Sequence, residues 1–548
     1  MVSRLKLGHL IVIFAVVALP FAATFALYYP DERHYTDGAM LMLQHGDWLS
    51  PHTGYGTLRF EKPILAYWAV GISWLIFGVN TMAARLPFLL ISCGTVWLTY
   101  HMARRFTGSV QTALLTVIIL ISQPLFFLSA VRNMPDALLT FFVVLSAYGF
   151  LRLLALNEFT RASYWMAYGG AAGAALSKGM LGVAIVLFCW AFVYLPKRDG
   201  AALKKLLHWP SLLSAIALVA SWFIYIIAIH GKAAWRAFFA DQVTDNLDGH
   251  FWTPALRILP FAGMVLVGFL PWSLVIGEGI FRQKQWAGGN VPPILRRFIL
   301  IWTAALVVGF SIGSNISTRY TLPATPLLAI LLADWFSALN EDALFFNLTR
   351  IILATVAFLC AASTTIILVA YEWHAPLLFP CVATALVVAL LIGLGAGSVR
   401  LNYFPRPEAL GLCMLAGWLI LIMAIIPVLP SDSAIQTAEA LKKMPGSPRP
   451  VLVVGNVQVA NRLRMQLGPK WSVVQARKLN PASINSYKYF VLPQAEAQDF
   501  ANRGWQVRIA AVEPRAGTLA EIWMAIKERN IPEYLDGAGK KVYLAAAP

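Results

Sequence analysis

Long apolar runs recur along most of this chain and constrain its fold more than any other feature. Between Leu10 and Pro430 they follow one another, each about 20 residues long and able to cross a hydrocarbon layer of about 30 Å. They stop after Ser431. Of the 548 residues, 59% are hydrophobic and 13% are charged, against roughly 25% charged in soluble domains. The chain is therefore predicted to be an α-helical polytopic membrane protein.

Segmentation by hydropathy predicts thirteen spans, with centres near Val16, Thr95, Ile118, Val144, Ala171, Leu187, Leu218, Val267, Leu306, Leu328, Phe358, Val387 and Leu419. Residues 63–78 are also apolar, but counting them as a span would invert the later basic loops. They are therefore predicted to form an interfacial or re-entrant helix within a first external loop, residues 28–80. Residues 1–26 resemble a signal peptide, but an uncleaved first span is favoured because more spans follow.

Basic residues mark alternate loops of this topology. The positive-inside rule makes those loops cytoplasmic and explains the net charge of +17 without a nucleic-acid partner. The first external loop and the C-terminal region then face the periplasm of a bacterial inner membrane. The basic positions are Arg104 with Arg105, Arg161, Lys197 with Arg198, Lys204 with Lys205, Arg282 with Lys284, Arg296 with Arg297, and Arg350.

The last part of the chain changes character. Residues 1–430 are predicted to be the membrane domain, and residues 431–548 a small periplasmic α/β domain. Short apolar runs at 451–454, 489–492, 507–512 and 542–544 are typical of strands separated by helices. The turn after the first run is neither a GxGxxG nor a P-loop, so no nucleotide cofactor is expected. A lid or scaffold without chemistry is the favoured interpretation of this domain.

The predicted topology gathers ionisable residues from distant segments at one external face. Such groups near apolar helix ends are costly unless they pair, face water or have a function, so a single polar site is the simplest hypothesis. A carboxylate there is suited to deprotonating an acceptor, and Lys or Arg to holding a phosphate leaving group. The residues are Asp31, Glu32, Arg33, Glu61, Lys62, Arg132, Asp136, Lys178, Asp245, His250, Arg319 and Tyr320.

A series of short motifs occurs in order along the membrane region: Asp31-Glu32-x-x-Tyr35, Gly46-Asp47-Trp48, Phe60-Glu61-Lys62-Pro63, Arg85-Leu86-Pro87, Pro135-Asp136, Ser177-Lys178-Gly179, His250-x-x-x-Pro254, Leu270-Pro271-Trp272 and Arg319-Tyr320-x-Leu322-Pro323. Together they resemble the GT-C glycosyltransferases related to bacterial 4-amino-4-deoxy-L-arabinose transferase and, more distantly, to protein O-mannosyltransferases. The resemblance covers roughly residues 31–326. Each motif alone has little specificity, and the resemblance rests on the order and spacing of the motifs together.

This resemblance implies an inverting transferase. It would move a sugar, 4-amino-4-deoxy-L-arabinose, from undecaprenyl phosphate to lipid A at the periplasmic side of the membrane. Asp31 and Asp136 would be the catalytic residues. Glu32, Arg33, Tyr35, Lys62, Lys178, Arg319 and Tyr320 would bind substrate.

The resemblance also implies a divalent metal such as zinc, held by Glu61 and His250; carboxylate and imidazole both suit zinc. His250 is alternatively a loop histidine bonded to backbone. Lys178 could reach a phosphate or extend to water from an apolar helix, and the Arg319–Tyr320 pair could position a phosphate or anchor the chain at the interface.

Two departures from the family pattern leave the substrate open. The first motif reads Arg33-His34-Tyr35 where the family often has Arg directly before the tyrosine, and Lys62-Pro63-Ile64 replaces a double proline. A GT-C enzyme acting on protein or another glycan is therefore one alternative. A transporter is the other, although neither repeated halves nor charges at mid-membrane favour it.

Overall fold

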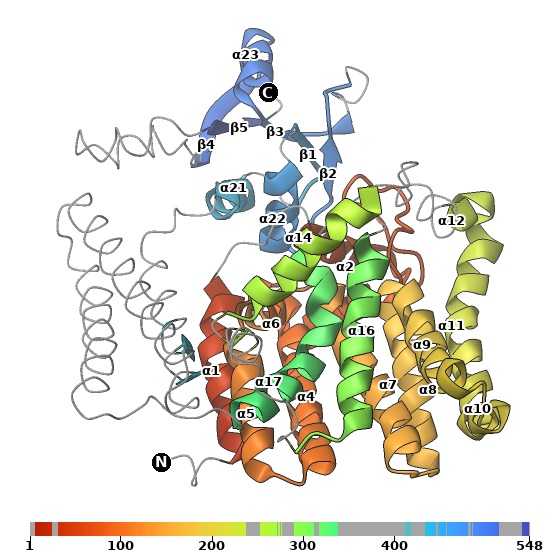
Figure 1. The fold of residues 1–548 in the computed structure, drawn as a ribbon. Coiled ribbons are helices and arrows are strands. Elements are labelled where there is room, and N and C mark those ends of the chain that lie inside the picture. The colour runs from red at the N-terminus through yellow and green to blue at the C-terminus, as the bar shows by residue number, and fades with distance from the viewer. Residues whose placement is uncertain are drawn as a thin grey trace, which may run out of the picture.

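The structure is a computed structural model. It describes residues 6–24, 31–236, 253–270, 272–273, 276, 290–311, 317–337, 411–412, 414–415, 417, 433–444, 448–455, 457–480, 484, 486–513 and 540–546. These residues form a bundle of apolar helices with a small sheet domain at one end (Figure 1).

The bundle confirms the prediction of a multi-pass α-helical membrane protein. Ten of the thirteen predicted centres lie in its helices, and those near Phe358, Val387 and Leu419 lie outside the described residues. The helices are α1 (Leu7–Thr24), α4 (Thr81–Thr107), α5 (Val110–Ser122), α7 (Pro135–Ala155), α8 (Arg161–Lys178), α9 (Met180–Lys197), α11 (Trp209–His230), α14 (Thr253–Gly268), α16 (Pro293–Ser311) and α17 (Thr325–Ser337).

The number of spans stays a prediction. Within the described residues, α4, α7, α11 and α16 are each long and apolar enough to cross a membrane. A fifth span is possible if α5 and α6 (Pro124–Ala130), bent by 69° at Gln123, count as one. Pro124 causes the break because it cannot continue the hydrogen bonding of α5, and the Gln123 side chain caps α6 through the Phe126 N–H at 2.7 Å.

Glycines let α7 and α8 pack at close range. A Cβ on Gly170 of α8 would lie 2.5 Å from the Ser146 nitrogen on α7, and one on Gly149 would lie 2.3 Å from the Ala167 nitrogen. In a membrane the hydrophobic effect does not drive helices together, and small residues stabilise helix contacts because they let the backbones pack closely. The close packing sets the position of Lys178, the last residue of α8.

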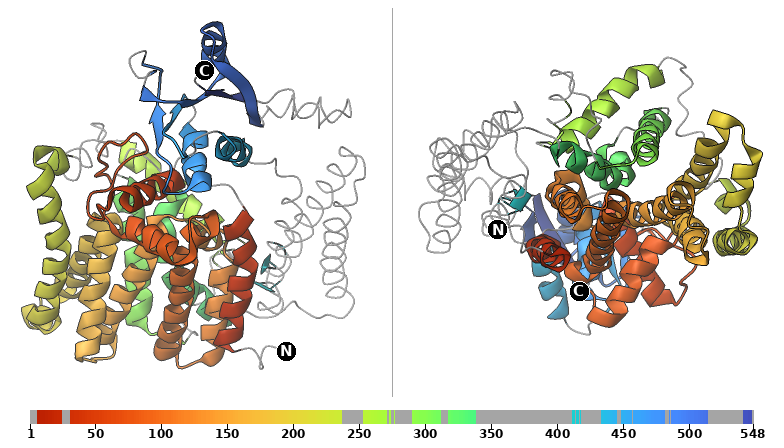
Figure 2. Two further views of the ribbon diagram at one scale, coloured as in Figure 1. Left: turned by 180° about the vertical axis from the view of Figure 1, so that it is seen from behind. Right: turned by 60° about the horizontal axis from the view of Figure 1, so that its bottom comes forward.

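The first loop contains two helices. The helix α2 (Asp31–His45) lies across the end of the bundle that faces the sheet domain, and α3 (Leu65–Phe77) packs against α2 and α4 (Figure 2). The helix α3 has 13 residues, fewer than the about 20 that a span takes, and its interfacial or re-entrant position stays a prediction. Its exposed face is apolar: Ile72, Leu75, Ile76 and Phe77.

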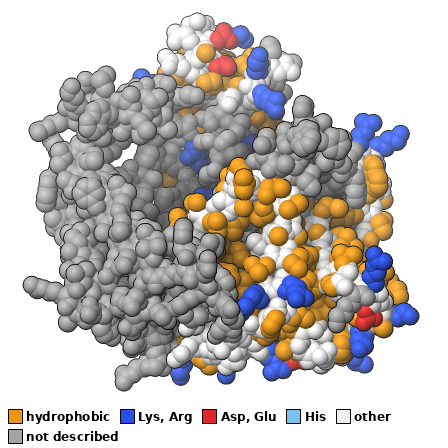
Figure 3. Space-filling model, in the orientation of Figure 1, with side chains coloured by type: hydrophobic (Ala, Val, Ile, Leu, Met, Phe, Trp, Pro, Cys, Tyr) orange, Lys and Arg blue, Asp and Glu red, His pale blue; other side chains and the backbone are white. Residues whose placement is uncertain are grey.

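Basic loops lie at the end of the bundle opposite α2. Arg105 follows the predicted second span, and Arg152 precedes the next basic loop. Both form ion pairs with Glu158. The Tyr164 hydroxyl of α8 donates to the Lys205 carbonyl in α10 (Gly200–Leu206) at 2.7 Å. Hydrophobic side chains cover the described helices between the two ends, with Lys and Arg mostly towards the ends (Figure 3).

The C-terminal residues form a five-stranded mixed sheet in the order β2-β1-β3-β5-β4. Strand β1 is parallel to β2 and β3, whereas β5 is antiparallel to β3 and β4. The four predicted strands are present, and β2 is additional. The elements are α21 (Ser433–Lys442), β1 (Val451–Val454), α22 (Val457–Leu467), β2 (Val473–Ala476), β3 (Tyr489–Leu492), α23 (Gln494–Asn502), β4 (Gln506–Glu513) and β5 (Lys540–Ala546).

Alternate residues of the strands pack on opposite layers of this domain. Val451 and Val453 of β1 contact α21 and α22, while Leu452 and Val454 face the α23 side. This is the period-2 pattern of a strand buried on both faces. It directs α22 towards the membrane domain, where it contacts α2 (Figure 1).

Candidate functional site

Asp31 opens the candidate site at the first turn of α2. Its carboxylate lies 3.0 Å from the Arg319 guanidinium, and both side chains remain about one-third exposed. Arg319 belongs to a short 3-10 helix, Thr318–Ala324, almost three hundred residues away in sequence. The exposed partial positive charge at a helix N-terminus favours a carboxylate at this position. Asp31 is therefore paired with Arg319 at a partly exposed position.

Asp136 and Lys178 form a second ion pair beside the first. Asp136 stands in the first turn of α7, Lys178 ends α8, and the Oδ1–Nζ distance is 2.5 Å. The Lys178 ammonium also lies 4.7 Å from the centre of the Tyr320 ring, a cation–π contact. Tyr320 follows Arg319 directly and stacks on Phe310. The two ion pairs therefore share one cluster: Asp31, Asp136, Lys178, Arg319 and Tyr320, called here the polar cluster.

Lys62 adds an unmatched charge to the polar cluster. Among the described residues its ammonium makes no hydrogen bond or ion pair, although the side chain is half-buried. Burial and the nearby charges of Lys178 and Arg59 lower the pKa of Lys62 to about 8, with Glu61 and Asp136 acting in the opposite direction. Three cations, Lys62, Lys178 and Arg319, thus accompany two carboxylates. An anionic group would complete this balance.

Arg59 organises the residues beside Lys62. It donates to the Tyr67 hydroxyl at 2.7 Å and to Glu61 at 2.8 Å, and it lies over the Tyr35 ring at 5.8 Å. Tyr35 is buried, with 5% exposure, against Tyr67, so its ring supports the site instead of lining an open space.

His34, next to Tyr35, stays uncharged in this surrounding. Burial and the charges of Arg59 and Arg33 lower the pKa of His34 to about 3, so the imidazole is neutral at physiological pH. A neutral ring at this position adds no further positive charge to the cations already present.

Glu32 points away from the site. Its carboxylate is fully buried and accepts two bonds from Arg85, at 2.8 and 2.7 Å, and a third from the Asn133 N–H at 3.0 Å. Arg85 also donates to the carbonyls of Phe21 and Ala22 near the end of α1. The expected contact of Glu32 with substrate is therefore corrected: this carboxylate joins α1, α2 and α4 and orients Asp31 beside it.

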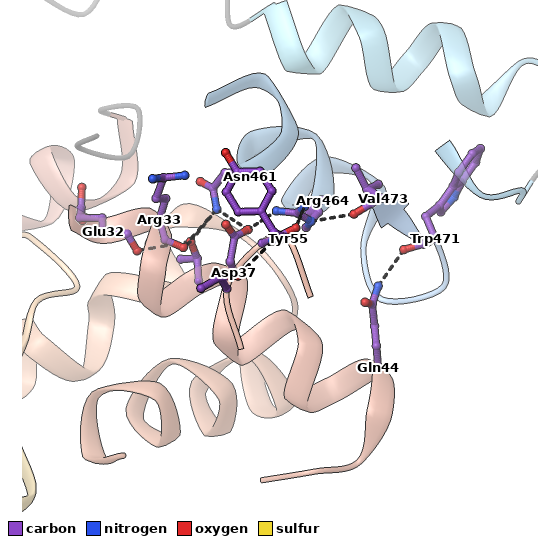
Figure 4. A network of polar contacts seen from close by, with 12 residues as sticks. Glu32, Arg33, Asp37, Gln44, Tyr55, Asn461, Arg464, Trp471 and Val473 are labelled. Atoms are coloured by element: carbon purple, nitrogen blue, oxygen red, sulfur yellow. Dashed lines mark hydrogen bonds and ion pairs between the residues drawn. The ribbon is translucent and has the colours of Figure 1, made fainter. Parts of the chain in front are cut away.

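Arg33 lies on the side of α2 that faces the sheet domain. Its carbonyl accepts from the Thr36 hydroxyl and, at 3.4 Å, from Asn461 of α22, and its side chain extends away from Asp37 (Figure 4). The predicted role of Arg33 in substrate binding stays a prediction.

The expected metal site has little support among the described residues. Glu61 is 62% exposed, and its carboxylate is bound by Arg59. His250 and Asp245 lie outside the described residues. No group of three or more His, Cys, Asp or Glu side chains that could hold a metal ion occurs in the described part of the chain. Since one of the two predicted ligands, His250, is not among the described residues, the metal site stays a prediction.

Sequence reasoning assigned no role to four residues that shape this site: Arg59, Arg85, Asn461 and Arg464. Arg85 stands in the Arg85-Leu86-Pro87 motif and within an apolar helix, where a buried cation signals a partner. Nothing comparable marks Asn461 or Arg464, because their partners on α2 are more than four hundred residues away in sequence.

Comparison with known proteins agrees with this geometry. The family model for dolichyl-phosphate-mannose-protein mannosyltransferase matches residues 4–233. A protein from Aquifex aeolicus described as uncharacterized is 32% identical over 343 residues, covering 61% of this chain and 65% of its own. The undecaprenyl phosphate-alpha-4-amino-4-deoxy-L-arabinose arabinosyl transferase of Erwinia tasmaniensis is 30% identical, covering 66% of this chain and 67% of its own. The matches thus span about two thirds of these relatives.

A solved structure shares the whole architecture. The crystal structure of ArnT from Cupriavidus metallidurans bound to undecaprenyl phosphate superposes with a TM-score of 0.73, at 18% identity and 99% coverage of both chains. Fold and site together define a membrane glycosyltransferase of the GT-C class. The chain belongs to the family of undecaprenyl phosphate-aminoarabinose arabinosyl transferases.

Proposed function

We propose that this protein transfers 4-amino-4-deoxy-L-arabinose from undecaprenyl phosphate to lipid A. The reaction takes place on the periplasmic side of the bacterial inner membrane. One observation supports the reaction class above all: the polar cluster and Lys62 present three cations to two carboxylates at the mouth of an apolar bundle. Such a site suits a phosphate attached to a lipid chain.

The residues divide the chemistry between them. Lys62 and Lys178 bind the phosphate of the donor, and Arg319 steadies the charge that grows on it as the bond between the sugar C1 and the phosphate oxygen breaks. Asp31 orients the acceptor oxygen and removes its proton when that oxygen is a hydroxyl. The acceptor oxygen bonds to C1 from the opposite face, and undecaprenyl phosphate leaves.

Asp136 has a supporting part in this scheme. Its carboxylate holds the Lys178 ammonium at 2.5 Å, and Tyr320 lies against the same ammonium. The pair fixes the direction of Lys178 towards the phosphate. Asp136 therefore acts on the donor through Lys178, whereas Asp31 acts on the acceptor.

The relatives support the choice of sugar and carrier. The Erwinia tasmaniensis protein is named for undecaprenyl phosphate-aminoarabinose, and the ArnT crystal structure holds undecaprenyl phosphate. A different glycan or a protein acceptor would leave the roles of Asp31 and Lys62 unchanged.

The test is a transfer assay with the purified enzyme in lipid nanodiscs. Synthetic undecaprenyl-phosphate aminoarabinose and lipid A are supplied, and products are measured by mass spectrometry. Asp31→Asn should lower the rate about 10²- to 10⁴-fold, because it removes the base but keeps the size of the side chain. Asp499→Asn is the matched control, since Asp499 forms an exposed ion pair with Arg503 on α23.

The outcomes separate the alternatives. An aminopentose added to lipid A by the wild type and not by Asp31→Asn supports the proposal. Transfer to another acceptor alone would keep the class and refute lipid A. If the wild type transfers no sugar in nanodiscs but moves the donor across the bilayer of sealed liposomes, a transporter replaces the enzyme. Zinc stays a prediction, checked by elemental analysis of the wild type and Glu61→Gln.

A further inference from the structure

The C-terminal domain holds the catalytic helix by a buried ion pair. Arg464 of α22 lies 2.6 Å from Asp37 of α2, and both side chains are 2% exposed (Figure 4). Asn461, one turn earlier on α22, donates to Asp37 at 2.9 Å and to the Thr36 hydroxyl at 3.0 Å. Two side chains of the sheet domain therefore satisfy one carboxylate of the membrane domain.

Arg464 also reaches two other segments. Its Nε donates to the Val473 carbonyl of β2 at 2.9 Å, and a terminal nitrogen donates to the Gly54 carbonyl. Gly54 belongs to the loop between α2 and α3 that leads to Lys62. One guanidinium thus joins the sheet, the helix that begins at Asp31 and the loop that carries Lys62.

The ion pair of Arg464 and Asp37 packs tightly against the loop at Gly54. A Cβ on Gly54 would lie 2.5 Å from the Arg464 Nη1 and 2.5 Å from an Asp37 oxygen. The glycine lets the backbone approach closely enough to accept the bond. Further contacts surround the pair: Gln44 donates to the Trp471 carbonyl at 2.7 Å, and Arg477 lies over the Tyr55 ring.

Asp37 lies six residues after Asp31 on the same helix, about 9 Å along its axis. The start of α2 is fixed from the membrane side by Arg85 through Glu32. Its middle is fixed from the opposite side by Arg464. Neither ion pair includes Asp31, so both act on the reaction through the backbone of α2.

We propose that Arg464 and Asn461 are positioning residues of the transferase, and that the C-terminal domain sets the distance between Asp31 and Lys62. This inference rests on the proposed function. A shift of about 1 Å between reacting groups costs about a hundredfold in rate. A buried ion pair adds little net stability over an apolar pair of similar size, so the geometric role accounts for its presence better than stability does.

The test separates position from stability. The double variant Asp37→Leu/Arg464→Met replaces the pair by apolar side chains and avoids leaving a lone buried charge. We expect a modest fall in its melting temperature, because the Val473 and Gly54 carbonyls lose their donor although no lone buried charge remains. Its kcat per folded enzyme should fall about 10- to 100-fold, with a smaller change in KM for the donor. Arg503→Met, which breaks the exposed pair with Asp499 in the same domain, should change neither quantity.

Asn461→Ala provides a milder second variant. It removes the bonds to Asp37 and Thr36 and leaves the ion pair, so the protein should fold normally with kcat lowered several-fold. Wild-type kcat in the folded double variant would overturn the inference. If the double variant does not fold, unchanged kcat in Asn461→Ala would overturn it. Absence of transfer by the wild type would instead refute the proposed function.

Discussion

Lys62 shows how one residue defines the chemistry of the site. Its ammonium lies near two other cations and, among the described residues, has no hydrogen-bonded partner of its own. The nearby positive charges and partial burial make its proton easier to lose. A bound phosphate would reverse this effect, because a negative charge favours the protonated form. The pKa of Lys62 is therefore expected to be lower in the free enzyme than in the donor complex.

This difference predicts a pH dependence. In the free enzyme Lys62 is charged below its pKa of about 8 and loses its proton as the pH rises through that value. Since the charged form binds phosphate, kcat/KM for the donor should fall above pH 8. Lys62→Arg should keep kcat/KM level to higher pH, because arginine stays protonated. The measurement is a pH profile of kcat/KM from pH 6 to 10.

Lys204→Arg is the control for this profile, since Lys204 is exposed at the opposite end of the bundle. It should reproduce the wild-type curve. A decline near pH 8 that persists in Lys62→Arg would assign the titration to another group and remove Lys62 from donor binding.

The two carboxylates of the first motif bind different partners in the fold, and their order along the chain does not predict which. Asp31 and Glu32 are adjacent on α2, and consecutive positions of a helix point in directions about 100° apart. Asp31 faces the open side with Arg319, whereas Glu32 faces the helices and binds Arg85. The choice between them required the position of α4, which local sequence does not contain.

At the scale of elements, the packing of α7 on α8 places the Asp136–Lys178 pair. Asp136 lies at the start of α7 and Lys178 at the end of α8, so the two antiparallel helices bring these ends together. Gly149, Gly170 and Gly173 allow the close approach. Hydropathy predicted both helices, and it carried no information on how near they come.

Two neighbouring glycines on α8 provide a test of this packing. Gly170→Ala would place a Cβ 2.5 Å from the α7 backbone. A Cβ added at Gly169 would have no neighbouring atom within 4 Å. We expect Gly170→Ala to lower the melting temperature and the transfer rate because α8 must move. Gly169→Ala should be neutral or slightly stabilising, since alanine favours helix by about 1 kcal/mol over glycine. Equal melting temperatures for the two variants would refute the close packing.

At the scale of the whole molecule, the active face and the basic loops lie at opposite ends of the bundle. Loop contacts place Arg105, Arg152 and Lys205 at one end of the bundle. The helix α2 and the sheet domain lie at the other end (Figure 1). The positive-inside rule predicts that the sheet domain faces the periplasm. In that orientation a lipid-linked donor would enter from the outer leaflet.

Cysteine labelling tests the orientation. In a background with the native cysteines replaced by serine, Arg503→Cys should react with a membrane-impermeant maleimide in intact spheroplasts. Lys205→Cys should react only after the membrane is permeabilised. Both positions are exposed, so a difference reports the side of the membrane and not burial. The reverse pattern would invert the topology and contradict the periplasmic site.

The sequence by itself determined the class of this protein. Its apolar runs predicted a helical membrane domain, the change after Ser431 predicted a separate sheet domain, and the ordered motifs from Asp31 to Pro323 predicted the family. These properties depend on local composition and on spacing along the chain, which a sequence records directly.

Only the tertiary structure decided which polar residues meet. The pairs Asp31–Arg319, Glu32–Arg85 and Asp37–Arg464 join residues from 53 to more than four hundred positions apart. Ion pairs act over a few ångströms in space, whatever the separation along the chain. The folded bundle and the docked sheet domain bring these partners together, and so determine which carboxylates are buried in ion pairs and which one stays partly exposed.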